Sequence, residues 1–371
     1  MSTIYIKNGR TVNDESIEIL IQDKKIEKIS TKFEENVTAD KTIDLKGESI
    51  VSAGWIDGHT HCYDDMELYG DDPDKIGYST GVTTVIDAGT TGADNIGDFY
   101  KKAKDSKTNV FAYLNISKTG IIAQNELGDL KNINNDLVTE KLKEFPDFII
   151  GIKARISRSV VDGNGVIPLI EAKKIQKENN NLPLMVHVGS EPPKLKDILD
   201  QLDQGDILTH CYNGKSNGIL NEDKEIKDFV DEAYKKGIIF DIGHGTDSFN
   251  FNTAEVAKNH QLIPYTLSTD IYRRNRSEGP VYDFPTTIEK MLVLGYSMEE
   301  ILPMITSHPA EIINLKNKGQ LREGYDADIT IFKLKKANKK LVDSNGNIKN
   351  TKVVVRPTYT IIEGNLYNPG E

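Results

Sequence analysis

The sequence has few cysteines, no surplus of positive charge and no long apolar run. Its 371 residues include two cysteines, Cys62 and Cys211, so no disulfide framework is predicted. No apolar run reaches the roughly 18 residues that span a bilayer, and the first residues read as a strand rather than a signal peptide. The net charge of −11 argues against nucleic acid as a partner. We therefore expect a cytoplasmic protein that binds neither membranes nor nucleic acid.

The middle of the chain alternates between strand-like apolar runs and amphipathic helical stretches. Eight strands are predicted, over residues 50–61, 82–88, 110–116, 148–156, 182–188, 207–210, 238–243 and 265–270. Helices are predicted between most of these strands and after the last, over residues 94–105, 136–144, 167–178, 194–202, 222–236, 253–259 and 285–294. Successive β/α units predict an α/β fold, a (β/α)8 TIM-like barrel.

The two ends of the chain differ from the middle, because short strands and polar turns replace the helices. Strands are predicted over 3–7, 17–21 and 25–30, with a turn at 8–9. Further strands are predicted over 328–333, 352–357 and 359–363, separated by polar turns such as 343–347. We expect both ends to form one small β-sandwich domain from residues 1–51 and 315–371. The barrel would then occupy residues 52–314.

A histidine pair ends the first predicted barrel strand, in the run Gly58-His59-Thr60-His61. Alternate residues of a strand point to the same side, so the two imidazoles share a face. Imidazole is the side chain that most commonly binds metals. The pair is therefore a candidate for half of a metal site.

Lys153 and Arg155 share one face of the fourth predicted strand and would point into the barrel, because Ile152, Ala154 and Ile156 suit the outer face. A buried lysine is costly unless it is paired. One interpretation is a salt bridge to an inward carboxylate, Asp57 or Asp270. The other is a neutral amine that CO2 converts to a carbamate bridging two metals, since burial and nearby cations lower a lysine pKa.

Three further residues end later strands. His187 lies in the fifth strand, His210 ends the sixth and Asp270 ends the eighth. The carboxyl ends of barrel strands meet on one face, where the functional groups of such barrels gather. Four histidines, one lysine and one aspartate are thus predicted to converge on one rim.

This set resembles the amidohydrolase superfamily in its binuclear subtype, and the resemblance covers nearly the whole chain. The segments Ser307-His308-Pro309-Ala310 and Gly324-Tyr325-Asp326-Ala327-Asp328 are similar to the family's helix after the barrel and its return into the β-domain. The details Gly151-Ile152-Lys153-Ala154-Arg155 and His210-Cys211-Tyr212-Asn213-Gly214 are similar to the subgroup labelled dihydroorotase-like or deacetylase. Members of that subgroup are implied to hydrolyse N-acetyl amino acids or O-acetyl 2-hydroxy acids.

The resemblance implies two divalent metal ions, with zinc expected and manganese or iron as alternatives. His59, His61 and Asp270 would hold the inner ion, and His187 and His210 the outer one. A carbamate on Lys153 and a hydroxide would bridge them. The hydroxide would attack the carbonyl, and Asp270 would pass a proton to the leaving atom. Such barrels commonly pair, so a homo-oligomer is compatible with the resemblance.

Substrate contacts are predicted less directly. Arg155 would grip a substrate carboxylate, or else pair with a barrel aspartate. Arg273, with Arg274 and Arg276, would attract anions from a loop, or else form a solvated basic loop. Tyr212 and Asn213 would donate to the carbonyl oxygen or the polar tail of the substrate, Ser190 has a similar role, and His244 would contact the substrate from the end of the seventh strand.

The leading hypothesis is a metallohydrolase that cleaves an acyl amide or ester of a small carboxylate-bearing substrate. The first alternative is a cyclic amidohydrolase that resembles dihydroorotase or hydantoinase and uses the same metals. An adenine-type deaminase is disfavoured because many deaminases use one metal and lack the lysine of strand four. A non-catalytic barrel is disfavoured because all six expected ligand positions are intact.

Overall fold

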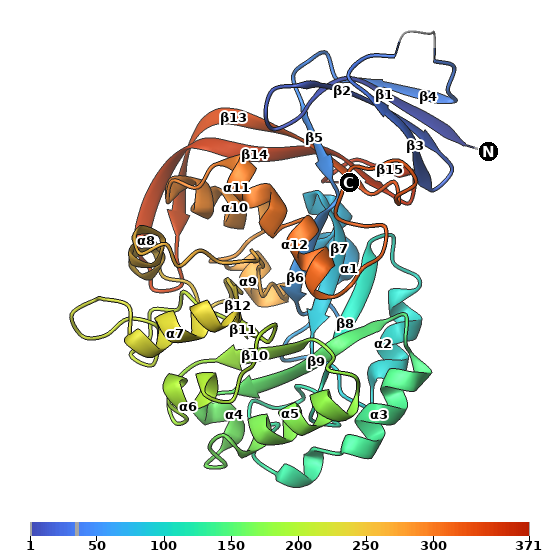
Figure 1. Cartoon of the computed structure of the whole chain (residues 1–371). Helices are drawn as coiled ribbons and strands as arrows, with labels where there is room; N and C mark the ends of the chain where they lie inside the picture. The colour runs from blue at the N-terminus through green and yellow to red at the C-terminus, as the bar shows by residue number, and fades with distance from the viewer. Residues whose placement is uncertain (1, 34–36, 371) are drawn as a thin grey trace.

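The computed structural model describes residues 2–33 and 37–370, and its centre is a parallel sheet (Figure 1). Seven strands pair in chain order: β6 (Trp55–Thr60), β7 (Val82–Ala88), β8 (Asn109–Asn115), β9 (Ile149–Ile156), β10 (Leu184–Val188), β11 (Ile207–Thr209) and β12 (Ile239–Asp241). Every residue of β7 is buried, as expected for a parallel strand covered on both faces. Six of the predicted strands thus appear with ends shifted by three residues or fewer.

Helices surround this sheet. They are α1 (Pro73–Ile76), α2 (Ile96–Ala103), α3 (Asn135–Glu144), α4 (Arg158–Val161), α5 (Ile167–Glu178), α6 (Leu195–Leu199), α7 (Asp228–Lys236), α8 (Phe251–Asn259), α9 (Arg273–Ser277), α10 (Phe284–Val293), α11 (Met298–Met304) and α12 (Ser307–Ile312), with 3₁₀ turns η1 (Tyr78–Thr80) and η2 (Leu130–Asn132). The predicted helix over 222–236 begins later, at Asp228, and α6 is shorter than expected. No helix of the described residues is long and apolar enough to cross a membrane.

The eighth predicted strand, 265–270, does not form a continuous strand. Instead Thr266 bridges Asp241 of β12 and Ile271 bridges Thr60 of β6, so this segment touches both edges of the seven-stranded sheet. Asp270 has a φ of 50°, in the left-handed region, which ends the extended conformation. The prediction of a regular strand was wrong because a period of two along the sequence does not reveal such a backbone reversal.

The predicted strand over 50–61 is two strands in different sheets. It breaks at Gly54, where an added Cβ would lie 2.2 Å from the Thr83 hydroxyl oxygen, so only glycine allows this close approach. The first half, β5 (Ile50–Ala53), pairs with strands from both ends of the chain. The second half, β6, opens the parallel sheet and carries His59.

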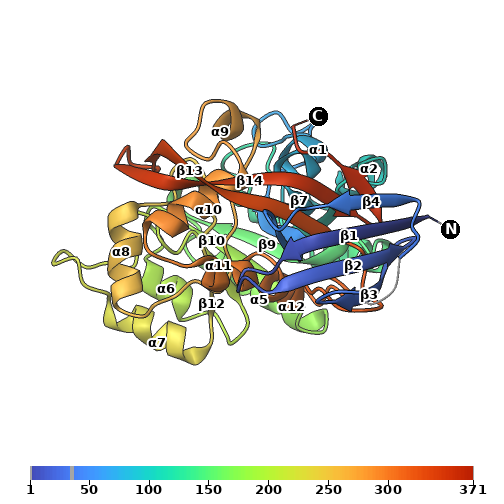
Figure 2. The ribbon, with the colours of Figure 1, turned by 90° about the horizontal axis from the view of Figure 1, so that it is seen from above.

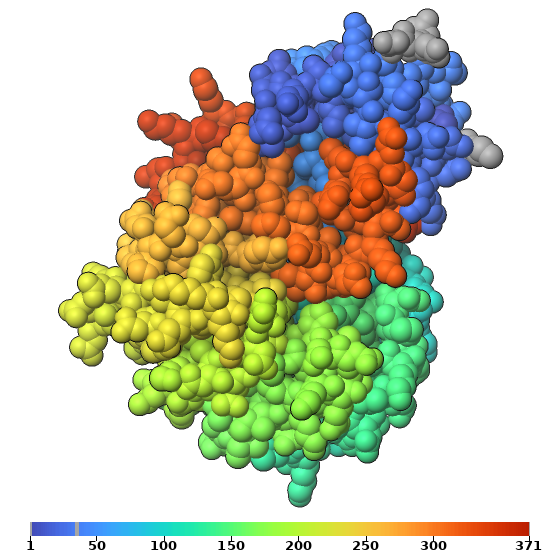
Figure 3. All heavy atoms as spheres, viewed as in Figure 1, coloured from blue at the N-terminus to red at the C-terminus, as the bar shows by residue number. Residues whose placement is uncertain are grey.

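Both chain ends meet in an eight-stranded sheet (Figure 2). Its order is β15 (Asn365–Tyr367), β14 (Ile348–Ile362), β13 (Ile329–Val342), β5, β1 (Thr3–Arg10), β2 (Ser16–Gln22) and β3 (Lys25–Ser30), and β4 (Lys41–Asp44) also pairs with β1. Figure 3 shows the early and late segments side by side on one surface. The predicted turn at 8–9 is a bulge inside β1, and the C-terminal strands are longer than predicted.

Candidate active site

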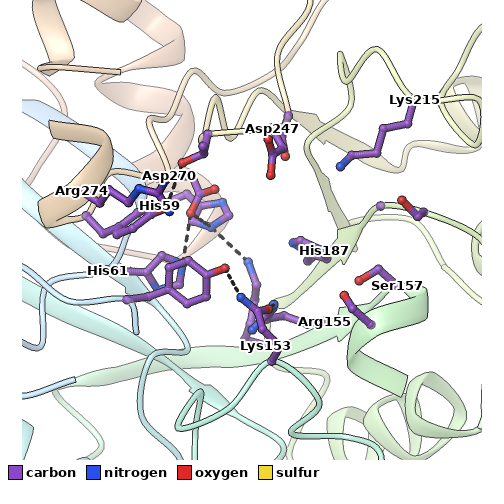
Figure 4. A pocket seen from close by; sticks show the side chains of 18 residues that line it. His59, His61, Lys153, Arg155, Ser157, His187, Lys215, Asp247, Asp270 and Arg274 are labelled. Atoms are coloured by element: carbon purple, nitrogen blue, oxygen red, sulfur yellow. Dashed lines mark hydrogen bonds and ion pairs between the residues drawn. The ribbon is translucent and has the colours of Figure 1, made fainter. Parts of the chain in front are cut away.

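A cavity of about 390 Å³ opens at the carboxyl ends of the parallel strands (Figure 4). Of the predicted ligands, all but His210 line it, and the lining residues together are His59, His61, Tyr69, Gln124, Lys153, Arg155, Ser157, Ser159, His187, Gly189, Ser190, Lys215, Thr246, Asp247, Ser248, Asp270, Tyr272 and Arg274. His210 lies directly behind, with its ring centroid 4.6 Å from that of His187. The predicted ligand residues therefore converge on one buried region.

Asp270 lies at the centre of this group. Its Oδ1 is 3.1 Å from Nε2 of His61 and 3.4 Å from Nε2 of His59. One donor atom from each of His59, His210 and Asp270 lies within 4.8 Å of the others. Burial alone would raise the pKa of Asp270, but the neighbouring imidazoles hold that pKa well below its ordinary value.

Hydrogen bonds fix the orientation of three imidazoles. Nδ1 of His210 is 2.6 Å from the carbonyl of Gly243, and a carbonyl only accepts, so Nδ1 carries the proton. Nδ1 of His59 is 2.9 Å from Thr209 Oγ1, whose proton goes to Asp241 at 2.7 Å. His61 Nδ1 is 2.7 Å from Thr90 Oγ1. For His59 and His210 the Nε2 lone pair thus remains free, the arrangement that a metal-binding histidine needs.

The electrostatics of the histidines agree with this arrangement. Burial lowers the pKa values of His61 and His187, and it lowers the pKa of His210 to about 3. The rings are therefore neutral at ordinary pH, which is the ligating form. Both His210 and Asp270 have positive φ, at 68° and 50°, and strained backbone of this kind concentrates at functional sites.

Lys153 is 1% exposed and lies at the floor of the cavity. Its Nζ is 3.4 Å from His59 Nε2 and 3.1 Å from Met185 Sδ. Burial lowers the pKa of Lys153 to about 7. No ion pair joins it to Asp57 or Asp270 within the described residues, and Asp57 instead accepts hydrogen bonds from Thr269. The salt-bridge interpretation is not supported. The lowered pKa instead allows Lys153 to be a neutral, reactive amine near neutral pH.

Lys153 packs closely against Gly89, the residue that follows β7. An added Cβ at Gly89, which has a φ of 79°, would lie 2.5 Å from Cβ of Lys153. A side chain there would displace the lysine from the floor of the cavity.

Arg155 also faces the cavity, and its partners come from a loop rather than from a barrel strand. Its guanidinium is 3.3 Å from Glu126 Oε1 and 2.9 Å from Gln124 Oε1, and it lies 5.5 Å from the ring centroid of Tyr69. The alternative of a barrel aspartate as its partner is therefore wrong. Only 6% of Arg155 is exposed, so an anion reaching it would be shielded from water.

Four of the residues predicted to contact the substrate lie off the cavity wall. Tyr212 is fully buried and its hydroxyl donates to the carbonyl of Leu262, because its position faces the core. Asn213 donates to the carbonyl of His210 and so shapes the loop. His244 stacks on Phe249 and accepts from Lys290. Arg273 donates to the carbonyl of Asp64, and its neighbour Arg274 lines the cavity instead.

Ser190 does line the cavity, as expected, and several other lining residues were not predicted from the sequence. Ser157 follows Arg155 by two positions, so strand alternation already indicates it. Tyr69, Gln124, Lys215 and Asp247 lie in loops, where no periodic signal exists. Their placement depends on contacts between distant segments.

The donor set fits divalent metal ions. Neutral imidazoles, an ionised carboxylate and an amine that can be carboxylated are nitrogen and oxygen donors of the kind that zinc, manganese and iron bind. The fold and this site define a hydrolase of the amidohydrolase type.

Comparisons with known proteins identify the family. The chain is 53% identical to a deacetylase from Enterococcus faecalis over 98% of its own length and 99% of that protein's. It is 34% identical to a deacetylase from Agrobacterium fabrum, over 95% and 87% of the two chains. Residues 321–368 match the model of a deacetylase-like composite domain. The chain belongs to the deacetylase-like family, which is related to dihydroorotase within the amidohydrolase superfamily, and is a hydrolase acting on C–N bonds.

Solved structures agree on the fold. A crystal structure described as an adenine deaminase superposes with a TM-score of 0.97 at 52% identity and covers 99% of this chain and 100% of that chain. A structure described as a dihydroorotase gives a TM-score of 0.91 at 32% identity, with 99% and 98% coverage. These relatives bear names for three different reactions, so their names do not agree on one substrate.

Proposed function

We propose that this protein is a metal-dependent deacylase that removes an acyl group from a small amide or ester bearing a carboxylate, such as an N-acyl amino acid or an O-acetyl 2-hydroxy acid. One observation carries the proposal. The cavity holds the convergent His59, His61 and Asp270 on one side, and Arg155 beside Lys153 on its floor. A carboxylate at Arg155 would place the acyl group of a small substrate near Asp270.

Two divalent ions, with zinc expected, would be held by His59, His61 and Asp270 and by His187 and His210, with a Lys153 carbamate between them. When bound, such ions activate water and polarise a carbonyl at neutral pH. We also propose that segment 264–271 serves as the eighth strand of a closed barrel beside a small β-sandwich. We also propose that the protein is cytoplasmic and that its binding partner is a small-molecule substrate.

The chain's own residues have separate tasks in this reaction. Arg155 binds and orients the substrate carboxylate by charge and paired N–H groups. Tyr69 and Tyr272, whose ring centroids lie 4.9 Å apart, form an aromatic wall beside His61 that excludes water. Asp270 Oδ accepts the proton released from the attacking water and returns it to the leaving nitrogen or oxygen.

A cyclic amidohydrolase is the second candidate, because Arg155 would also bind the carboxylate of a ring substrate such as dihydroorotate. The similarity to a structure described as a dihydroorotase supports this candidate. Adenine has no carboxylate, so it leaves the cationic floor of the cavity without a partner.

The test is a hydrolysis panel on metal-reconstituted protein, with N-acetyl D- and L-amino acids, O-acetyl 2-hydroxy acids, dihydroorotate, hydantoin and adenine. Turnover of the acyl carboxylates is expected, and Arg155→Met should raise KM for them about tenfold or more while metal content stays at two ions. Turnover restricted to ring compounds or to adenine would overturn the deacylase proposal. Unchanged KM in Arg155→Met would remove Arg155 from the binding site.

A further inference from the structure

Lys215 is a cavity residue that the proposed reaction does not use. It lies in the loop after His210 and lines the cavity together with Arg155 and His187. Figure 4 shows its amino group pointing into the cavity from the side opposite His61. Lys215 therefore adds a cationic group on this far wall to those of Arg155 and Arg274 in the lining of one small cavity.

The Lys215 side chain is the lining cation that lacks a partner within residues 2–33 and 37–370. Arg155 pairs with Glu126, and Arg274 pairs with Glu278 at 3.2 Å. Among the residues that the structure describes, none forms a hydrogen bond or ion pair with Nζ of Lys215, although the residue is half-buried. A partly desolvated ammonium without a counter-ion is unfavourable, and an anionic ligand would relieve that cost.

The backbone of Lys215 is held firmly. Its N–H donates to Asn213 Oδ1 at 3.0 Å, and its carbonyl accepts from the N–H of Gly218 at 2.9 Å. The preceding Gly214 packs against Asn250 and Asn345, since an added Cβ there would lie 2.7 and 2.6 Å from their side-chain amide atoms. The lysine thus projects into the cavity from a loop whose backbone is held by hydrogen bonds.

Hydroxyl groups also line the cavity, and Figure 4 shows Ser157 on the side where Lys215 lies. Ser157 follows Arg155 on the same strand face, is 5% exposed and lines the cavity, and its hydroxyl has no hydrogen-bond partner among the described residues. Ser190 also lines the cavity. Hydroxyls can donate to a carboxylate, so this part of the lining suits an anion.

Asp247 is the acidic group at the mouth of the cavity, and it argues for a cationic ligand instead. The ion pair with Glu278 chiefly raises the pKa of Arg274, and the charge of Asp247 adds a smaller contribution in the same direction. Asp247 is exposed, whereas Ser157 and Arg155 are buried, and water screens exposed charges most. The anionic interpretation of the far wall therefore outweighs the cationic one.

We propose that Lys215, with Ser157 and Ser190, forms a second anion subsite, so that the preferred substrate is the acyl derivative of a dicarboxylic amino or hydroxy acid. One carboxylate would bind Arg155 and the other Lys215. Water would add its oxygen to the acyl carbon as the C–N or C–O bond breaks, and the leaving atom would receive the proton, yielding acetate and the free diacid. This inference rests on the proposed function.

The experiment compares matched substrates that differ by one charge. N-acetyl aspartate is paired with N-acetyl asparagine and N-acetyl glutamate with N-acetyl glutamine, in both enantiomers, on metal-loaded protein. The diacid of at least one pair should show kcat/KM about tenfold higher or more, as a good charged contact provides. In Lys215→Met this ratio should fall towards one, and Lys215→Arg should retain most of it. Lys224→Met, on the same long loop but outside the cavity, is the control and should keep the wild-type ratio.

The outcomes separate this inference from the proposed function. Equal kcat/KM within each pair, or a preference that survives in Lys215→Met, would overturn the second subsite and leave the deacylase standing. If no acyl carboxylate is turned over, the deacylase fails, and calorimetric titration with succinate and with its monoamide tests the subsite alone. Tighter binding of succinate that is lost in Lys215→Met supports the subsite, and equal binding overturns it.

Discussion

Two lysines that are equally buried lie in regions of opposite character. Lys153 is 1% exposed and Lys290, in α10, is fully buried, and burial lowers the pKa of each to about 7. Lys153 borders the cavity, and within the described part of the chain its Nζ has a 3.4 Å contact with an imidazole and a contact with a methionine sulfur. Lys290 donates to His244 Nε2 at 2.7 Å and to the carbonyl of Pro280 at 2.8 Å.

The difference shows that burial and a lowered pKa do not by themselves mark a functional lysine. An amine reacts when it borders a cavity and has no strong hydrogen-bond acceptor. Lys153 meets both conditions. Lys290 lies outside the cavity lining and ties α10 to the loop that begins at Gly243, so its role is structural.

The largest expected effect distinguishes the two lysines directly. Lys153→Met should reduce turnover to background and lower the metal content below two ions per chain, because the bridging group is gone. Lys290→Met should keep both ions and most of the turnover. Activity assays and metal analysis of both variants measure the turnover and the metal content. If the two variants lose both equally, the distinction between a functional and a structural lysine is wrong.

Small carboxylic acids provide a control for the bridging role. Added to Lys153→Ala, they should restore part of the metal content and turnover, since a carboxylate can take the place of the carbamate. Full metal loading of that variant without any added acid would refute a bridge at Lys153.

The next effect concerns the proton at Asp270. Asp270→Asn should lower kcat by about 10² to 10⁴, the usual contribution of general acid–base catalysis. Asp343→Asn, in the turn between β13 and β14, is an acid-to-amide control outside the cavity. Stopped assays across pH 6–9 measure the loss, and wild-type kcat in Asp270→Asn would exclude the proton transfer.

A smaller effect is expected from the groups that orient His59. The Thr209 hydroxyl accepts a hydrogen bond from His59 Nδ1 and donates one to Asp241. Thr209→Val should therefore weaken metal binding about 10- to 100-fold, as loss of such supporting partners does. Competition with a metal-chelating dye measures the affinity. Thr266→Val, which removes another hydrogen bond to Asp241 without touching His59, is the matched control. Equal affinities in the two variants would contradict the orienting role.

The last effect is the pH dependence of stability caused by Lys290. Its pKa is about 7 in the folded chain and near its ordinary value of 10.5 in the unfolded chain. Between these two pH values the unfolded chain binds more protons, so the free energy of unfolding rises with pH, by at most about 1.4 kcal/mol per pH unit. Below pH 7 this contribution is flat.

Urea unfolding of the metal-free protein between pH 7.5 and 9.5 measures that slope. Under the same conditions, the slope of the unfolding free energy with pH should be smaller in Lys290→Met than in the parent protein, by at most about 1.4 kcal/mol per pH unit. An identical slope in both proteins would show that Lys290 keeps an ordinary pKa in the folded chain.

The sequence predicted the parts of the site that follow a strand period. The spacing of His59 and His61, and of Lys153 and Arg155, indicates that each pair shares a face, and the structure places all four on the cavity wall. The same reasoning wrongly predicted a regular strand up to Asp270, where the backbone turns left-handed, although Asp270 itself lines the cavity as predicted. It could not reveal Glu126 as the partner of Arg155, because that glutamate comes from a loop.

The sequence by itself determined the parallel β/α order, the side chains that point inward from each strand and the candidate donor set. These features depend on local periodicity, which a single chain displays directly. Only the tertiary structure decided that Tyr212 and His244 turn into the core and that Lys215 enters the cavity. It also decided that Lys290 is buried away from the cavity, with its amine hydrogen-bonded. Each of these depends on where loops from distant segments meet, and packing and hydrogen bonds between those segments fix that position.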